Sequence, residues 1–165
     1  MSTSATRELT LVGDAATVEF GRRLGRALAP AAGGVVTLSG HLGAGKTTFV
    51  KGLAEGLGVA EPRDVVSPTF VRVVTFEGPV RLVHVDAYRM KGPGDVVELG
   101  LDEDLAGGSV VALEWPEIVE GALPEDRVRI EIEHAAEDRR RVRVTPGGAA
   151  AAAWLLRVDW AGVGA

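Results

Sequence analysis

The distribution of apolar positions predicts a chain in which strands and helices alternate. Residues 7–13 and 33–39 are short runs rich in aliphatic and β-branched side chains, as is typical of strands. Between them, residues 14–30 repeat apolar positions at helical spacing, with Asp14 as the expected N-cap. The residues expected on the buried face of this helix are Phe20, Leu24, Ala27 and Leu28.

The later part of the chain contains two different strand patterns. Residues 70–76 and 80–86 have the pattern of two strands around a tight turn, and residues 109–115 are too apolar to alternate. Residues 126–133 and 139–144 alternate strictly between apolar and charged positions, which predicts an antiparallel hairpin with one exposed face. The expected fold class is therefore α/β: a P-loop NTPase-type open sheet with flanking helices, a mixed parallel core and antiparallel hairpin additions.

Three segments interrupt this alternation of elements. Residues 61–70 contain two prolines and are expected to form a loop, and the Gly/Pro-rich residues 90–108 are expected to form a short helix at most. Residues 146–165 are biased toward alanine, so this tail either docks as a helix or frays. The side chains through which it would dock are Trp154, Leu155 and Leu156.

A glycine-rich turn between a predicted strand and a predicted helix has the spacing of a phosphate-binding P-loop. Gly40, Gly45, Lys46 and Thr47 stand at the required positions, and glycine lets the main-chain N–H groups approach phosphate oxygens closely. Lys46 would neutralise the outer phosphates, and the Thr47 hydroxyl would ligate Mg²⁺. A turn used only for packing is the alternative. The β-branched strand before the loop and the helical spacing up to Gly58 favour the P-loop.

Two further predicted strands end in an acid, at Asp86 and Glu114. In an open α/β sheet, ligands bind outside the carboxyl ends of the strands, at the edge where the P-loop also begins. Asp86 is expected to hold the metal directly or through a water, and Glu114 to be a second metal ligand or a base that orients water. Either residue alone could be an exposed acid at a strand end, but the pair behind a P-loop favours a function.

Four other residues remain open between a functional and a structural role. Ser67 and Thr69 lie on a Pro-containing loop after the P-loop helix, where they form either a nucleotide-sensing loop or an ordinary turn. Trp115 is either an exposed stacking platform or a core residue. His41 is expected to be a solvent-facing loop residue.

Composition narrows the classes of ligand and partner. The formal net charge is −5, from 18 basic and 23 acidic residues, which argues against strong autonomous binding to nucleic acid. There is no cysteine, which excludes disulfides and thiolate metal sites. There is also no Asn or Gln, so the guanine-reading Asn-Lys-x-Asp signature and the water-positioning glutamine of Ras-type GTPases are both missing. The expected ligand is therefore an adenine nucleotide.

Length and hydropathy predict one globular domain over residues 1–165, with residues 1–7 and about 147–165 as the candidate flexible segments. Residues 1–10 have no apolar signal-peptide region. No segment approaches the roughly 20 apolar residues of a membrane span. We therefore expect a cytoplasmic protein that does not associate with membranes.

Five stretches together resemble the TsaE (YjeE) family in their order and spacing, over about residues 10–145. They are GHLGAGKTTFVKGLAEGLG, VSPTF, VDAYR, ELGLDEDL and LEWPE. A P-loop combined with S-P-T-[FY], D-x-Y-R and E-W-P is far more specific than any one of these motifs. The resemblance implies a P-loop ATPase of bacterial tRNA threonylcarbamoyladenosine (t6A) synthesis that uses ATP and Mg²⁺. It also implies that the partner proteins TsaD and TsaB carry the modification chemistry, and that tRNA is reached only through their complex.

Matching positions extend the resemblance to single residues. It implies that Thr47 and Glu114 ligate Mg²⁺, that Asp86 supports the metal and catalysis, and that Lys46 completes the catalytic set. The residues implied to bind the nucleotide are Gly43, Ala44, Gly45, Lys46, Thr47 and Thr48, with Asp14 near the adenine and Arg139 at the start of the last strand.

The resemblance also implies roles for residues around the site. Ser67 and Thr69 would form a switch-like loop, and Trp115 would lie near the partner surface. One departure is His41, because the family usually has an acid at this position. If that acid contributes to hydrolysis or to partner contact, activity differs here.

Three hypotheses about function follow. The first is a partner-activated ATPase switch that hydrolyses ATP slowly when it is alone. The alternative is a small-molecule or nucleoside kinase, which needs a mobile lid with arginines, and residues 138–141 are the candidate cluster. A nucleotide-binding scaffold without turnover is the third.

Overall fold

The computed structural model describes residues 6–31, 33–59, 62, 65–66 and 72–164. In this part of the chain the helices are α1 (Gly13–Leu28), α2 (Lys46–Leu57), α3 (Pro93–Glu98) and α4 (Ala149–Leu156). The strands are β1 (Arg7–Val12), β2 (Gly34–Ser39), β3 (Val73–Phe76), β4 (Leu82–Asp86), β5 (Val110–Glu114), β6 (Val128–Ala136) and β7 (Arg139–Pro146). Short helical turns occupy Ala29–Ala31, Asp104–Gly108, Pro116–Ile118 and Glu120–Ala122.

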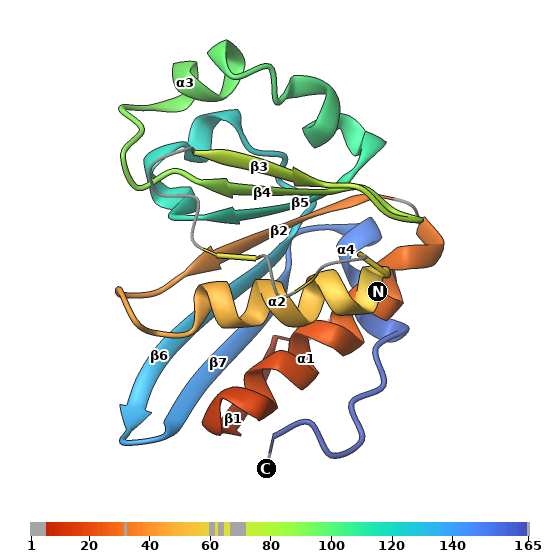
Figure 1. The fold of residues 1–165 in the computed structure, drawn as a ribbon, viewed down its shortest axis with the longest axis vertical. Helices are drawn as coiled ribbons and strands as arrows, with labels where there is room; N and C mark the ends of the chain where they lie inside the picture. Colours follow the sequence, from red (N-terminus) through yellow and green to blue (C-terminus); the bar gives the residue numbers. More distant parts are fainter. Residues whose placement is uncertain (1–5, 32, 60–61, 63–64, 67–71, 165) are drawn as a thin grey trace.

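The seven strands form one open, twisted sheet in the order β1-β7-β6-β2-β5-β4-β3 (Figure 1). β6, β2, β5 and β4 are parallel to one another, whereas β1, β7 and β3 join the sheet through antiparallel pairs. This arrangement confirms the predicted mixed sheet with antiparallel additions. Because the parallel strands point the same way, their carboxyl ends lie along one edge of the sheet.

The two faces of the sheet are covered differently. α1 and α2 lie side by side along one face, as Figure 1 shows, and pack with inward-facing residues from most of the strands into the larger core. The other face is covered over β2, β5 and β4, where a smaller core includes Val35, Val83, Val85, Val111, Leu113 and residues of and after α3. The four residues expected on the buried face of α1 are all buried there. The three central strands β2, β5 and β4 are therefore enclosed from both sides.

Glycines bring the backbones of α1 and α2 into contact. A Cβ added to Gly21 would lie 2.2 Å from the carbonyl oxygen of Phe49, and one added to Gly52 would lie 1.9 Å from that of Val18. The other two glycines at this contact are Gly25 and Gly56. Real Cβ atoms cannot approach a carbonyl oxygen so closely, so these positions require glycine. The contact fixes α2, which follows the P-loop, against α1.

The start of α1 differs from the expectation. The N-cap position is held by Val12, without a side-chain hydrogen bond, so the prediction of Asp14 as N-cap was wrong. β1 runs directly into the helix through Gly13, whose φ is 79° and whose N–H donates to the Asp138 carbonyl oxygen over 2.7 Å. This tertiary contact replaces a side-chain cap. It leaves Asp14 in the first turn, where the helix dipole favours a carboxylate.

The alanine-rich tail is docked. The Trp154 ring lies against Gly34, and the Trp160 ring centre lies 6.0 Å from that of Phe20. The Trp160 indole N–H donates to the Leu155 carbonyl oxygen over 3.1 Å, and the Arg7 guanidinium lies 4.3 Å from the ring centre. Tryptophan side chains therefore hold the tail against α1 and the sheet. None of the helices in the described ranges is long and apolar enough to cross a membrane.

Candidate functional site

The loop between β2 and α2 has the backbone that a phosphate-binding turn needs. Gly40, Gly43 and Gly45 have φ values of 158°, 79° and 110°, which side-chain-bearing residues rarely adopt. A Cβ on Gly43 would meet nothing within 4 Å, so this part of the loop opens toward free space. Gly45 is the left-handed N-cap of α2, and no side chain caps the helix. The first N–H groups of α2 are thus available to an anion from outside.

Lys46 is folded back over its own loop. Its Nζ donates to the Gly40 carbonyl oxygen and lies 3.7 Å from the centre of the Trp115 ring. Burial lowers the pKa of the Lys46 ammonium below its ordinary value, and the nearby Glu114, Asp86 and Glu117 charges counteract only part of this effect. A buried ammonium with only partial compensation is a favourable partner for phosphate oxygens.

Asp86 and Glu114 end two adjacent parallel strands, and the register pairs them directly. Both are buried, with 2% and 3% of their surfaces exposed. Asp86 Oδ1 accepts a hydrogen bond from the Tyr88 backbone N–H over 2.9 Å. Glu114 Oε2 accepts from the Thr47 hydroxyl over 3.4 Å and contacts His84 Nε2 at 2.6 Å. The structure therefore brings both predicted acids beside the threonine of the P-loop.

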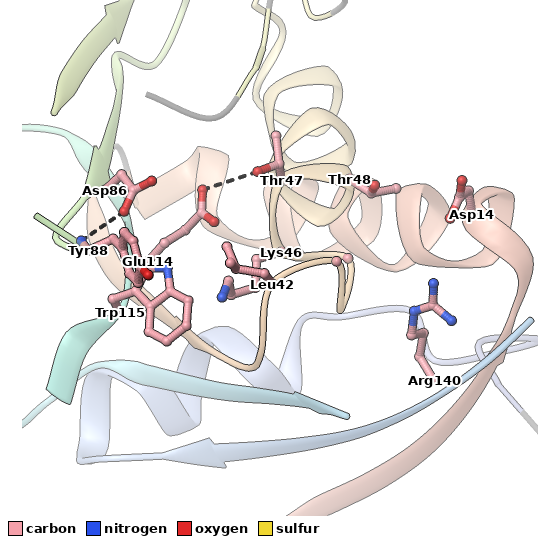
Figure 2. A pocket seen from close by; sticks show the side chains of 12 residues that line it. Asp14, Leu42, Lys46, Thr47, Thr48, Asp86, Tyr88, Glu114, Trp115 and Arg140 are labelled. Atoms are coloured by element: carbon pink, nitrogen blue, oxygen red, sulfur yellow. Dashed lines mark hydrogen bonds between the residues drawn. The ribbon is translucent and has the colours of Figure 1, made fainter. Parts of the chain in front are cut away.

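These groups surround one cavity of about 530 Å³ at the carboxyl edge of the sheet. Figure 2 shows Asp86, Tyr88 and Trp115 at one end, and Asp14 and Arg140 at the other, with the residues that open α2 between them. The lining residues are Asp14, Leu42, Gly43, Gly45, Lys46, Thr47, Thr48, Asp86, Tyr88, Glu114, Trp115 and Arg140. An elongated cavity with the buried Asp86 and Glu114 at one end and a glycine-rich loop along its length can take a nucleotide.

The structure places most of the sequence-predicted site residues on this cavity, and the exceptions are Arg139, Ala44, Ser67 and Thr69. Arg140 lines the cavity in place of Arg139, because successive strand residues point to opposite faces. Arg140 Nε also donates to the Ala44 carbonyl oxygen over 2.9 Å, so Ala44 takes part through its backbone. Ser67 and Thr69 lie outside the described residues.

Sequence reasoning missed three lining residues, Leu42, Tyr88 and Arg140. Leu42 follows His41 in the loop, and 74% of its surface is exposed. Tyr88 lies two residues after Asp86, and its ring centre lies 4.9 Å from that of Trp115. The period of two along β7 could have identified Arg140, but nothing in the pattern singled out Leu42.

Trp115 lies on the rim of the cavity, directly after β5. Its φ and ψ are 63° and 51°, a left-handed conformation that is strained for an aromatic residue. Its N–H donates to the Leu38 carbonyl oxygen over 3.2 Å, and the adjacent Glu114 carbonyl oxygen accepts from Ala87 over 3.0 Å. Hydrogen bonds to neighbouring segments therefore hold a turn that aims the indole at Lys46.

The oxygen atoms at the acid end of the cavity suit Mg²⁺. Two buried carboxylates and one hydroxyl are hard oxygen ligands, and Mg²⁺ completes its octahedron with waters and substrate phosphates. Among the described residues, no group of three or more His, Asp or Glu side chains could enclose an ion by itself. The donor set thus fits a metal shared with a phosphorylated ligand.

The open sheet and the glycine-lined cavity at its carboxyl edge define the class as a P-loop α/β protein. The family model for the threonylcarbamoyl adenosine biosynthesis protein TsaE matches residues 12–142. This chain belongs to the TsaE family.

Individual relatives agree with this membership. A Bacillus subtilis (strain 168) protein, named tRNA threonylcarbamoyladenosine biosynthesis protein TsaE, is 45% identical over 117 residues, which are 70% of this chain and 72% of that protein. The protein of the same name from Streptomyces coelicolor is 48% identical over 136 residues, or 77% of this chain and 88% of that one. The crystal structure of Bacillus subtilis YdiB superposes with a TM-score of 0.67 at 34% identity and covers 87% of each chain.

Proposed function

We propose that this protein is the ATP-binding and ATP-hydrolysing component of the t6A modification machinery, acting as a partner-activated switch on a TsaB–TsaD complex. The single observation that supports it most is the cavity where a P-loop, a threonine hydroxyl and two buried carboxylates meet. The names of the relatives supply the pathway, since they are called t6A biosynthesis proteins. The partners and the switch come from the resemblance to the family.

In this proposal the nucleotide phosphates lie along the P-loop. The N–H groups from Gly43 to Thr48 bind phosphate oxygens, and the Lys46 ammonium moves from the Gly40 carbonyl to the outer phosphates. In its present position the buried Lys46 ammonium is only partly compensated by neighbouring carboxylates. After the movement, the phosphate oxygens would supply the missing negative charge. The base then lies toward Asp14 and Arg140, at the other end of the cavity.

Thr47 and Glu114 would hold Mg²⁺, with Asp86 as a supporting ligand. When bound, the ion would neutralise charge on the β- and γ-phosphates. Glu114 would also orient a water molecule toward the γ-phosphate. Hydrolysis then breaks the bond between the γ-phosphorus and the bridging oxygen, and the attacking water supplies the oxygen of the released phosphate.

The open side of the cavity supports the proposal that a partner activates the protein. Leu42 and Tyr88 lie on its rim with 74% and 46% of their surfaces exposed, and such apolar exposure is typical of a contact surface. A partner that covers this rim would exclude water from the phosphates and strengthen the electrostatic interactions there. Slow turnover by the isolated protein is the expected consequence.

The kinase alternative is less well supported by the position of its arginines. A kinase lid must move over the transferred phosphoryl group, but Arg139, Arg140 and Arg141 are paired with strands on both sides of β7. The Arg140 guanidinium is also bonded to the Ala44 carbonyl oxygen of the P-loop. This arrangement suits a fixed wall of the cavity better than a mobile lid.

The decisive experiment is ATP turnover by the purified protein, alone and with the TsaB and TsaD proteins of the same organism. We expect a low basal rate that the partners raise, with both rates lost in Lys46→Ala. The matched control is Lys51→Ala, because Lys51 lies on the same helix but does not line the cavity. Turnover that requires an added small molecule and ignores the partners would instead support a kinase.

A further inference from the structure

His84 is a fully buried polar residue beside the candidate site, and the proposed mechanism gives it no role. It lies in the middle of β4, two residues before Asp86, and none of its surface is exposed. Side chains two residues apart on a strand share a face, so the imidazole points to the same side of the sheet as the Asp86 carboxylate. The neighbouring strand offers Ala112 at the register position of His84, and this small side chain leaves room for a ring.

The imidazole makes its hydrogen bond with Glu114. His84 Nε2 lies 2.6 Å from Glu114 Oε2, and both side chains are buried. Positioning of an ionised Glu114 requires Nε2 to be the donor, because a carboxylate can only accept. Among the described residues, Nδ1 has no hydrogen-bond partner. The hydrogen bond that orients the ring within this part of the structure is therefore the one that holds the carboxylate.

This contact determines which Glu114 oxygen is left for a ligand. Oε2 accepts from both His84 and the Thr47 hydroxyl, so the carboxylate is held between β4 and the first turn of α2. Oε1 is then the oxygen that can turn toward the cavity. In Figure 2 the Glu114 carboxylate lies between Asp86 and Thr47, and a dashed line marks its hydrogen bond with the Thr47 hydroxyl.

The Lys46 ammonium competes with His84 and Thr47 for the Glu114 carboxylate. Of the charges that act on the buried Lys46 ammonium, Glu114 has the largest effect on its pKa. A glutamate without a second anchor has three side-chain torsions with which to reach that cation. If it did so, Glu114 would occupy the cation that the phosphates need.

We propose that His84 is a positioning residue for Glu114, which it holds beside Thr47 and away from Lys46 so that Oε1 faces the reacting phosphate and its metal. The proposal rests on the proposed function, because it concerns the same site. Partners of this kind that orient a metal-binding side chain typically alter metal affinity or activity by roughly 10- to 100-fold when they are removed.

Two substitutions separate positioning from simple loss of structure. His84→Leu removes the donor and keeps an apolar side chain, whereas the amide nitrogen of His84→Gln can occupy the place of Nε2. We expect His84→Leu to lower kcat for ATP hydrolysis roughly 10- to 100-fold, with metal-free ADP binding unchanged, and His84→Gln to recover most of the rate. Val83→Ala is the matched control, because Val83 is buried on the opposite face of the same strand. Wild-type kcat in His84→Leu, or equally slow Leu and Gln variants of equal thermal stability, would overturn the proposal.

Two readouts do not depend on turnover. First, Mg²⁺ should strengthen ADP binding to the wild type more than to His84→Leu, and an equal gain in both proteins would contradict the proposal. Second, nitrogen NMR of histidine-labelled wild-type protein should show the His84 ring protonated at Nε2, with this resonance shifted in Glu114→Ala. A ring protonated only at Nδ1 would refute positioning, whatever the outcome for His84→Leu.

These readouts also separate the proposal from the proposed function. An Nε2-protonated ring coupled to Glu114, in a protein that never hydrolyses ATP even with its partners, would support positioning and reject the ATPase. Normal partner-activated turnover with the other tautomer would reject positioning and support the ATPase.

Discussion

The parallel centre of the sheet and its antiparallel hairpin place their charged residues in opposite environments. In β2, β5 and β4 almost every residue is buried, and the charged residues at the strand ends, Asp86 and Glu114, are buried with them. In β6 and β7 the apolar residues alternate with exposed charges, among which Glu131, Glu133, Arg141 and Arg143 lie on an open face.

This difference in burial determines how strongly the charged residues interact with their neighbours. Opposite charges on the exposed face pair with one another, as Arg143 does with Glu8 over 3.0 Å, and solvent screens them. The acids at the central strand ends are shielded by α2 and by the segments after β4 and β5, so their interactions with Lys46 and with a bound ligand are stronger. Charged residues should therefore be critical at the central strand ends and nearly dispensable on the open face of the hairpin.

The largest effect is expected at the centre of the site. Lys46→Ala removes the cation that phosphates would recruit, and should abolish measurable nucleotide binding, a loss of roughly 100-fold or more. Calorimetric titration with ADP and ATP measures this, with Lys51→Ala as the control on the same helix. Retained affinity in Lys46→Ala would remove the P-loop assignment.

Glu114→Ala should separate binding from turnover. The P-loop remains intact in this variant, so ATP binding should persist, while partner-stimulated hydrolysis should fall by about 100-fold or more. Glu98→Ala, at the exposed end of α3, is the matched control for loss of a carboxylate. Equal turnover by Glu114→Ala and the wild type would exclude a catalytic role for this acid.

Gly52, at the contact between α1 and α2, should affect the stability of the fold. In Gly52→Ala the new Cβ would meet the Val18 carbonyl oxygen at 1.9 Å, so α1 and α2 must separate. We expect a loss of about 2 kcal/mol in the free energy of unfolding, as is usual for overpacking. Denaturant unfolding measures this against Gly94→Ala, because a Cβ on Gly94 meets nothing within 4 Å. Equal stability of the two variants would contradict the close helix contact.

The smallest effect is expected on the open face of the hairpin. The Arg143 side chain is exposed, and so are its partners Glu8 and Glu131. Such ion pairs contribute little, so Arg143→Ala should leave both the thermal unfolding midpoint and ATP turnover unchanged. Differential scanning fluorimetry and the turnover assay test both. A clear loss of partner-stimulated turnover alone would show that this face contacts a partner.

Much of the fold was predictable because local patterns and tertiary structure agree. The strict alternation at Val128, Ile130 and Ile132 predicted the hairpin, and these residues are buried as expected. The apolar run before Glu114 predicted a strand covered on both faces. The spacing of the P-loop identified the residues that open α2, since backbone requirements at glycine are local.

Other features depended on contacts between distant segments. The N-cap expected at Asp14 is absent because Gly13 bonds to the β6–β7 turn instead. The choice between Arg139 and Arg140 depends on which face of β7 meets the P-loop. The glycine contact between α1 and α2 pairs residues about thirty positions apart, and neither helix alone shows why Gly52 cannot be alanine.

The sequence by itself determined the period of each element, the glycines of the loop and the acids at the strand ends, because these depend on the backbone within a few residues. Tertiary structure alone decided that His84 reaches Glu114, that Trp115 covers Lys46 and that tryptophans hold the tail. Each of these contacts joins segments from different strands or helices. Their strength comes from burial, which exists only after the sheet and its helices have assembled.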